Sequence, residues 1–547
     1  MSRQNNNLFP FRKLPKIEWP VTRTPNQPQN EPLFGYGQVQ NTAGGYVWTV
    51  DDWMRLDRFL VLGSEGGTYY TSPRALALEN AEAVLRCLQA DGLRTVARIT
   101  EVSTEGRAPK NSPALFALAM AAGLGDDPTR QAALAALPQV ARTGTHLFNF
   151  LGYVEQFRGW GRALRRAVGS WYTEMPAHRL AYQTVKYRQR DGWTHRDALR
   201  LSHPKASSEQ HQAIFHWVTQ GWPSVGEVPH PDAVLRKIWA YERAKTAAHE
   251  REIVRLVSEH NLPWEAVPTK WLKSPSVWEA LLPTLPMTAL LRNLGRLSAI
   301  GLLGPLQNAN NLVADRLTNE DHLQKARIHP IAVLAALTTY EQGKGMRGKL
   351  LWTPVPRVVD ALNAAFYLSF GNVQPSGKRV VLALDVSGSM GYGLIAGIPG
   401  LSPRAGSAAM ALVTAATEQD YTVIGFSHEL IPLNISPGQR LNDAIRTVSN
   451  IPFGATDCAL PMQWALKNKV EADAFVVYTD SETWFGKVHP AQALGQYRAE
   501  TGIQAKLAVV GMVANSFSIA DPNDAGMLDV VGFDTATPQI LADFVRG

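Results

Sequence analysis

The chain has 547 residues, of which 45% are hydrophobic and 18% charged, so it is long enough to form two or three domains with separate cores. No apolar run is long enough to cross a bilayer, no apolar signal segment begins the chain, and only two cysteines are present, which excludes a membrane-spanning or disulfide-stabilised protein and favours a cytoplasmic one. The formal charge of +7 is uneven: residues 376–547 carry eleven Lys and Arg against sixteen Asp and Glu, so the preceding part is strongly basic and suits an anionic polymer as partner.

Residues 1–30 are rich in Asn, Gln and Pro, with prolines at positions 10, 15, 20, 25 and 28. Prolines at this density interrupt both helices and sheets, because each fixes one backbone angle and removes one N–H donor. We therefore predict a mobile or surface-draped tail.

A helical region follows, and we expect one domain over residues 31–373. Ser or Asp precedes Pro at four expected helix starts, Ser72, Ser112, Asp127 and Ser274. Glycines are expected to end helices at Gly92, Gly123 and Gly301. Amphipathic helices are predicted at 75–90, 162–173, 233–249, 287–300 and 330–342. Many short helices with tight connections suggest stacked HEAT-like pairs, and such a curved stack can close into a ring.

Residues 141–205 within this region contain twelve Lys and Arg but only four Asp and Glu. Four polar side chains recur there at steps of four, three and four residues: Arg179, Gln183, Lys186 and Arg190. This spacing predicts one solvent-facing basic stripe on a helix over 178–190. A second helix is expected at 195–201, with His203 just beyond it. The segment is a candidate nucleic-acid surface, because cations along a track bind phosphates and nearby rings stack on unpaired bases; the alternative is a solvated basic face.

From residue 376 the pattern changes to alternating strands and helices, so a second domain is expected over 376–547. Strands are predicted at 379–384, 421–426, 474–479, 505–511 and 528–532. Helices are predicted between them at 405–419, 440–449, 458–468 and 490–500. This alternation predicts a doubly wound parallel sheet, which gives the chain an α plus α/β fold class overall.

Oxygen-bearing side chains follow two of these predicted strands. The first strand leads into Asp385, Ser387 and Ser389, and Asp480 follows the strand at 474–479, while Thr456 lies in a turn before a helix. Ligands of open α/β sheets bind beyond the carboxyl ends of the strands, so these residues are expected to meet. Their oxygen atoms suit a hard divalent cation, with Mg²⁺ the ion expected. The alternative is that Ser and Asp simply cap the following helices.

Asp-x-Ser-x-Ser followed by a Thr and an Asp resembles the metal-ion-dependent adhesion site of von Willebrand A domains. Further motifs in the chain are GTHLFNF at 144–150, WGRALR at 160–165, VKYRQRDGW at 185–193, LRLSH at 199–203, LLRNLG at 290–295 and GATDCALPM at 454–462. These motifs resemble the TROVE module of the Ro ribonucleoprotein family. The resemblance runs from about residue 35 to the C-terminus, and the chain is identified as a bacterial member of that family.

The resemblance implies a ring of helical repeats closed by a von Willebrand A domain. It implies that an outer basic surface binds small noncoding Y RNAs, with contacts from Lys186, Arg190 and His203. It also implies that a central hole accepts the single-stranded 3′ ends of misfolded noncoding RNAs or rRNA precursors. Such a protein acts in RNA quality control, processing and decay, including under stress, with a 3′-to-5′ exoribonuclease as partner, and is a monomer apart from its ribonucleoprotein complexes.

Two other functions remain open at this point, and no catalytic residue is expected. Asp385 stands where phosphatases place an aspartyl nucleophile, but the second Asp that they place two residues later is Ser387 here, so a metal-dependent phosphohydrolase is the weaker alternative. A metal-dependent protein-adhesion module is the other alternative, in which a partner's carboxylate completes the coordination. Adhesion can coexist with RNA binding because the two surfaces belong to different domains.

Overall fold

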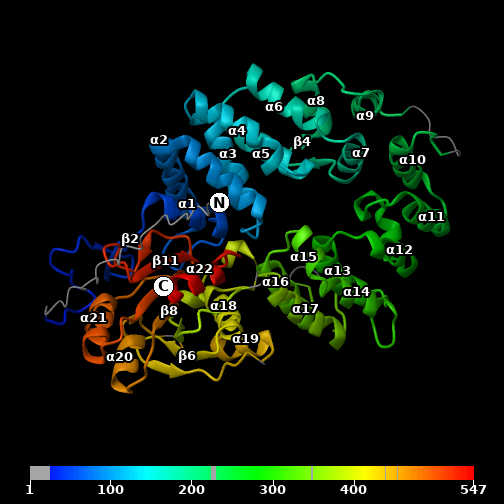
Figure 1. Ribbon diagram of the computed structural model, residues 1–547. Helices are drawn as coiled ribbons and strands as arrows, with labels where there is room; N and C mark the ends of the chain where they lie inside the picture. Colours follow the sequence, from blue (N-terminus) through cyan, green and yellow to red (C-terminus); the bar gives the residue numbers. More distant parts are fainter. Residues whose placement is uncertain are drawn as a thin grey trace, which may run out of the picture.

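The computed structural model describes residues 25–222, 229–345, 349–371, 373–398, 400–437, 439–452 and 454–547. A helical region is followed by a domain built around a six-stranded, mainly parallel sheet (Figure 1), as predicted. Of the predicted tail, residues 1–24 lie outside the described residues. Residues 25–30 lie against the C-terminal domain, where Gln29 is fully buried. None of the helices in the described ranges is long and apolar enough to cross a membrane.

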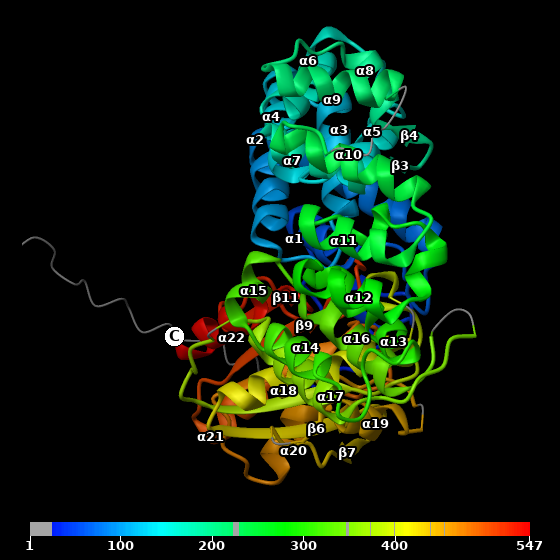
Figure 2. The same ribbon diagram turned by 90° about the vertical axis from the view of Figure 1, so that its right-hand side faces the viewer.

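The helical region contains seventeen α-helices within the described residues: α1 (Asp52–Leu62), α2 (Pro73–Glu105), α3 (Ser112–Leu124), α4 (Asp127–Val140), α5 (Gly144–Val154), α6 (Arg162–Thr173), α7 (Ala177–Lys186), α8 (His195–Ser202), α9 (Glu209–Gln220), α10 (Ala233–Thr246), α11 (Glu250–His260), α12 (Pro275–Leu281), α13 (Met287–Ala299), α14 (Ala309–Leu317), α15 (Glu320–Lys325), α16 (Pro330–Glu341) and α17 (Pro356–Leu368). Each packs mainly against helices close to it in sequence, as in a stacked array. The array follows a curved path from α1 through α9 and α10 to α17 (Figure 1). Figure 2 shows the same region from the side, with α6 and α8 farthest from the sheet.

The helix boundaries confirm part of the predicted capping. Ser72 and Ser274 are N-caps, whereas α3 and α4 begin one residue earlier than predicted because Asn111 and Asp126 occupy the cap positions. Gly301 follows α13 with φ 79°, as a helix-ending glycine should. The helix break predicted at Gly92 is present in part, because the backbone leaves the helical conformation at Asp91 (φ −158°) and resumes it directly afterwards within α2. The prediction for Gly123 is wrong, because this residue lies inside α3.

Both ends of the helical array contact the sheet domain. At the first end, the guanidinium group of Arg58 in α1 pairs with Asp529 in β11 (Met527–Val531) at 2.7 Å. At the other end, Thr338 of α16 hydrogen-bonds to Asn442 in α19 (Leu441–Ser449) at 3.3 Å. The helices and the sheet domain therefore form a closed circuit.

The sheet has the strand order β11-β9-β8-β5-β6-β7, with β7 antiparallel at one edge. Its other strands are β5 (Arg379–Asp385), β6 (Asp420–Phe426), β7 (Leu430–Pro432), β8 (Ala474–Thr479) and β9 (Lys506–Gly511). The central strands β5 and β8 are buried on both faces, which explains their unbroken apolar sequences. All five predicted strands form, and only the three-residue β7 escaped prediction in this sheet because it is too short to show a period.

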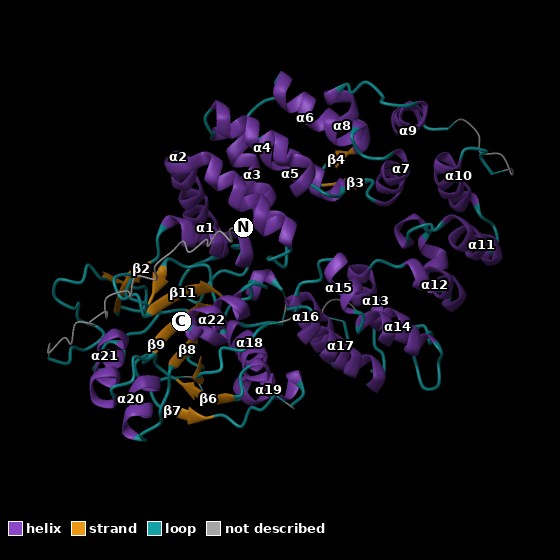
Figure 3. Ribbon diagram, in the orientation of Figure 1, coloured by secondary structure: helices purple, strands orange, loops and turns teal. Residues whose placement is uncertain are grey.

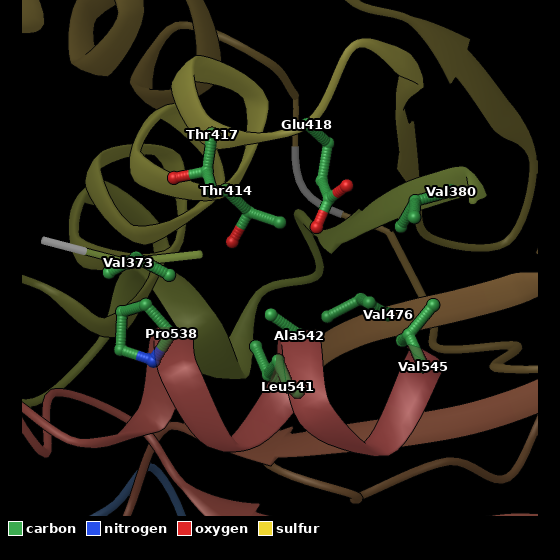
Figure 4. Close-up of a pocket in the computed structure, with 10 residues that line it drawn as sticks. All are labelled: Val373, Val380, Thr414, Thr417, Glu418, Val476, Pro538, Leu541, Ala542 and Val545. Atoms are coloured by element: carbon green, nitrogen blue, oxygen red, sulfur yellow. The ribbon is translucent and has the colours of Figure 1, made fainter. Parts of the chain in front are cut away.

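Helices cover both faces of the sheet. One face packs against α20 (Leu460–Lys467) and α21 (Pro490–Thr501), through side chains such as Met462 and Leu494. The other face packs against α18 (Pro403–Thr417), α19 and α22 (Thr537–Arg546). Figure 4 shows Leu541 and Val545 of α22 directed toward Val380 and Val476 of the sheet, around a small pocket beneath Glu418. This is the predicted doubly wound arrangement.

A second, three-stranded sheet joins the beginning of the chain to its end. It contains β1 (Val39–Gln40), β2 (Tyr46–Thr49) and β10 (Phe517–Ser518), all antiparallel. Apart from the hairpin between α7 and α8, the strands of the described residues gather in the C-terminal domain (Figure 3). The segment before α1 is therefore part of the sheet domain's structure, and it reaches the loops that follow β8.

Candidate metal centre and basic surface

The candidate metal ligands lie at the carboxyl ends of β5 and β8. These two strands are neighbours, and their following connections run to opposite faces of the sheet, which makes this edge a topological switch point. Asp385 is the last residue of β5, and Asp480 follows β8 directly. The structure therefore brings together the carboxylates of two predicted motifs that are far apart in sequence.

Hydrogen bonds fix the orientation of the first carboxylate. The Oδ1 atom of Asp385 accepts from the backbone N–H of Ser387 at 2.9 Å, and its Oδ2 atom accepts from the hydroxyl of Thr479 at 2.7 Å. The hydroxyls of Ser387 and Ser389 lie 3.2 Å apart, and Ser389 also hydrogen-bonds to the side chain of Asp480. Asp385, Ser387, Ser389 and Asp480 thus form one buried cluster of oxygen atoms.

The loop that carries Thr456 lies against this cluster. The backbone N–H of Gly388 donates to the carbonyl of Gly454 at 3.4 Å, which joins the two loops. Thr456 is buried, and its carbonyl accepts from the backbone N–H groups of Trp484 and Phe485, both at 3.1 Å. Its loop is therefore held between the loop after β5 and the loop after β8.

The carboxylates of the cluster are short of positive charge. Burial raises the pKa of Asp385; burial and then the charges of Asp385 and Glu482 raise the pKa of Asp480 well above its usual range. The guanidinium group of Arg404 is buried nearby, but it donates to the backbone carbonyls of Val386 and Ser387. A divalent cation would supply the missing charge, so the residues present fit such an ion.

The donor set also selects the type of ion. Nowhere in the described ranges do three or more His, Cys, Asp and Glu side chains gather as a metal site, so an ion here depends on hydroxyl ligands as well as on two carboxylates. Such an all-oxygen set suits Mg²⁺ better than Zn²⁺. Ser481 adds a further sign of a specialised loop, because it adopts φ 61° and its buried hydroxyl has no hydrogen-bond partner within the described part of the chain.

The predicted basic helix over 178–190 is wrong. Helix α7 ends at Lys186, and the chain then forms a hairpin of β3 (Gln189–Arg190) and β4 (Trp193–Thr194). Asp191 and Gly192 form its two-residue turn, with φ 51° and 82°. An Asp-Gly pair is a strong signal for such a turn, and this signal outweighed the helical spacing.

The prediction that Lys186 lies on a solvent-facing stripe is wrong. Its side chain is 6% exposed, and its Nζ atom lies 3.3 Å from the hydroxyl of Tyr182 and 3.9 Å from a carboxylate oxygen of Glu265. Burial lowers the pKa of Lys186. Gln183 is also buried, where its side chain accepts from the backbone N–H of Gly144 at 3.0 Å. The helical face that carries these two residues packs inward because it meets α5 and the turn that contains Glu265.

Arg190 and His203 are exposed, as an RNA contact requires. The side chain of Arg190 is 59% exposed, and its Nε atom lies 3.4 Å from Asp191. His203 is the C-cap residue of α8, with φ 46°, and it is exposed. The two residues lie at opposite ends of the segment from β3 to α8.

The exposed cations of this region are defined here as the basic surface: Arg162, Arg165, Arg166, Arg179, Arg188, Arg190, Arg196, Arg200 and Lys205. They come from α6, α7, the hairpin, α8 and the residues just after it. Within the described residues, Arg190 alone among them forms an ion pair. Most of this positive charge is therefore uncompensated by neighbouring carboxylates.

Comparisons with known proteins agree with this architecture. The family model described as the TROVE domain matches residues 39–258 and 249–339, and the one described as the Ro60 vWA domain matches residues 379–545. Over 525 residues the chain is 45% identical to "RNA-binding protein RO60" of Deinococcus radiodurans, which covers 95% of this chain and 98% of the relative. The chain belongs to the Ro60 family.

Two further matches support this Ro60-family assignment. "RNA-binding protein RO60" of Caenorhabditis elegans is 36% identical over 585 residues, covering 93% of this chain and 90% of the relative. The crystal structure of the Deinococcus radiodurans RO (RSR) protein matches with a TM-score of 0.69 and 44% identity, over 91% of this chain and all of that one. The family resemblance and the fold class inferred from sequence are both confirmed. Residues 25–38 of this Ro60-family chain lie outside both matched domains.

Sequence reasoning missed several residues that organise the metal centre. The sequence pattern marks Thr479 only as the end of a strand, although its hydroxyl donates a hydrogen bond to the carboxylate of Asp385. Arg404 and Gln29 were not considered, because each reaches the site through a contact distant in sequence. Of these residues, Arg404 alone could have been found from the sequence, because it is a single cation in a helix, α18, whose other residues are mostly small or apolar.

Proposed function

We propose that this protein binds RNA through its basic surface. The observation that carries the proposal is the group of nine exposed cations on neighbouring elements, of which a single one is neutralised by an ion pair among the described residues. Such a group binds phosphates and gains free energy by releasing counterions. The names of the two relatives, both RNA-binding proteins, support RNA as the polyanion.

We further propose a small noncoding Y RNA as the structured ligand of this surface. Arg190 and His203 are the direct contacts, since an arginine fork binds a phosphate and an exposed imidazole ring stacks on an unpaired base. Lys186 is a third contact, and a phosphate would have to compete there with Glu265 for the ammonium group. We therefore expect Lys186 to contribute less than the two exposed residues.

A second binding mode is proposed for the centre of the helical circuit. Single-stranded 3′ ends of misfolded noncoding RNAs or rRNA precursors would enter there, because a single strand needs less space than a duplex. The protein would then act in cytoplasmic RNA quality control, processing and decay, including under stress, with a 3′-to-5′ exoribonuclease as partner. We propose that it is a monomer apart from these ribonucleoprotein complexes.

The sheet domain is proposed to hold a divalent cation, with Mg²⁺ expected, through Asp385, Ser387, Ser389, Thr456 and Asp480. When bound, the cation would offer a coordination site to which a carboxylate of a partner protein can bind. Metal-dependent adhesion is therefore the second candidate function, and the buried, poorly compensated pair of carboxylates favours it. We propose no catalytic activity, because Ser387 stands where a phosphohydrolase needs a second Asp.

Crosslinking the purified protein to cellular RNA, followed by sequencing of the recovered RNA, tests the RNA proposal. We expect small structured noncoding RNAs from the unmodified chain and a much lower yield from the variant Arg190→Ala/His203→Ala. Lys325→Ala is the matched control, because it removes an exposed cation outside the basic surface. Equal yields from all three proteins would contradict RNA binding at this surface.

A further inference from the structure

The segment before α1 crosses the loops of the candidate metal centre. Residues 25–49, named here the N-terminal strap, lie against residues 481–488, the loop that begins directly after Asp480. Part of the strap, residues 25–38, lies outside both matched family domains.

Gln29 is the centre of these contacts, and it is fully buried. Its Nε2 atom donates to the carboxylate of Asp457 and to the carbonyl of Val488, both at 2.7 Å. Its Oε1 atom accepts from the hydroxyl of Thr483. Its backbone N–H donates to the carbonyl of Gly486 at 2.9 Å. One side chain thus joins the loop that carries Thr456 to the loop that follows Asp480.

The hydroxyl of Thr483 extends this connection to the candidate ligand itself. It lies 3.2 Å from the carbonyl of Thr456, and it accepts from the backbone N–H of Cys458 at 3.1 Å. Gln29 therefore fixes Thr483, and Thr483 contacts the residues on both sides of Asp457. The backbone that presents the Thr456 hydroxyl is held through this chain of contacts.

A second part of the strap holds the loop after Asp480. The side-chain amide of Asn41 donates to the carbonyls of Ser481 and Thr483, at 3.2 and 2.8 Å. The carboxylate of Glu482 accepts from the hydroxyl of Thr42 at 2.9 Å and from the backbone N–H of Ala43 at 3.1 Å.

The packing between strap and loops leaves no space for additional atoms. A Cβ atom added at Gly486 would overlap both the amide of Gln29 and the carboxylate of Asp457. A Cβ atom added at Gly45 of the strap would overlap the carbonyl of Thr483. These close approaches make the alignment of the two loops sensitive to the strap's position.

We propose that the N-terminal strap is a positioning element for the metal centre, with Gln29 as its principal positioning residue. It acts by fixing the loops that present Thr456 and Asp480, and it touches no metal ion itself. This inference rests on the proposed divalent-cation site. Replacing a side chain that orients metal ligands without binding the metal itself typically changes the metal affinity by about 10- to 100-fold.

The test is calorimetric titration of full-length protein with Mg²⁺. Gln29→Leu keeps the size of the side chain and removes its amide, and we expect Mg²⁺ to bind at least about tenfold more weakly. Gln40→Leu is the matched control in the same strap, because that exposed amide donates to the carbonyl of Gly44 and to no other group of the described residues, and the affinity of this variant for Mg²⁺ should be unchanged. Gly486→Ala is a second variant that separates Gln29 from Asp457 without altering the strap, and it should also weaken binding.

Hydrogen exchange without metal separates positioning from a general loss of stability. In Gln29→Leu, exchange should accelerate at the backbone N–H groups of residues 455–459 and 481–486 while β5 and β9 stay protected. If Gln29→Leu and Gly486→Ala remain folded and bind Mg²⁺ as tightly as the unmodified chain, the strap inference is refuted and the metal centre stands. Absence of Mg²⁺ binding in the unmodified chain would refute both.

Discussion

Arg58 offers the sharpest test of how the helical circuit is closed. Its guanidinium group is buried between α1 and the sheet domain, where it forms two hydrogen bonds to Asp529 at 2.7 and 2.8 Å. It donates three more, at 3.0 Å each, to the carbonyl and side chain of Asn515 and to the carbonyl of Phe517. Replacing it by Met keeps much of the apolar volume but leaves a buried carboxylate without its cation.

The expected cost follows from this burial. Breaking a buried ion pair by removing one partner destabilises a protein by about 3–5 kcal/mol, because the remaining charge stays buried. The exposed pair Arg86–Asp52, which joins α2 to α1, is the matched control, since Arg86→Met should cost about 0–1 kcal/mol. Burial raises the pKa of Asp529, so lowering the pH lets the unpaired carboxyl take up a proton. The deficit of Arg58→Met should therefore shrink in acid.

Urea unfolding of the full chain, followed by tryptophan fluorescence, measures both costs at neutral and acidic pH. Hydrogen exchange should locate the early opening of Arg58→Met at α1, β10 and β11, where the circuit closes. If Arg58→Met proves no more destabilising than Arg86→Met, the reasoning about the closure is wrong.

Three further predictions concern the metal centre, the RNA and the buried histidines. Asp385→Ala should abolish Mg²⁺ binding in calorimetry, and equal affinity in the folded variant would end the adhesion-site interpretation. A hairpin RNA with a 3′ overhang should bind more tightly than the same blunt hairpin, and excess Y RNA should compete partly; equal affinities would refute entry of strand ends into the circuit. Burial lowers the pKa of His195 to about 4, whereas in the unfolded chain it is 6.5. The unfolded state therefore takes up the proton first, so stability is complete above about pH 6.5 and falls as the pH drops toward 4, by about 2 kcal/mol at pH 5. The variant His195→Gln should lose less stability between pH 7.5 and 5 in urea unfolding, and an unchanged loss would contradict the assignment.

The parts of the fold that were predictable from sequence are those with local signals. Apart from Arg379, the residues of strands β5 and β8 are buried and read as apolar runs. Strand β5 ends at Asp385, and Asp480 directly follows strand β8. Because parallel strands share their carboxyl ends, proximity of Asp385 and Asp480 follows from topology alone. The family motifs occur in both residues 31–373 and residues 376–547, and they therefore assign to one protein family two regions that differ in charge and in their pattern of predicted helices and strands.

The unpredicted parts depend on contacts that are distant in sequence or on competing local signals. Strands of two residues, such as β1 and β10, show no period, and their pairing joins residues at opposite ends of the chain. For Lys186, the helical spacing is compatible with a solvent-facing stripe. Its contact with Glu265 could not be predicted, because the period of a helix says nothing about residues that lie elsewhere in the chain. The Asp191-Gly192 pair forms the turn of a hairpin, a local signal that competes with the helical spacing predicted over 178–190.

The central claim, that the basic surface binds RNA, is tested most directly by the salt dependence of affinity for one structured RNA. For the unmodified chain, the logarithm of the binding constant should fall steeply and linearly with the logarithm of the salt concentration, because each phosphate contact releases about one counterion. Charge reversal of two exposed residues on one face of α8, Arg196→Glu/Arg200→Glu, should weaken binding strongly and flatten that slope by about two. An unchanged affinity and slope in this folded double variant would contradict the account.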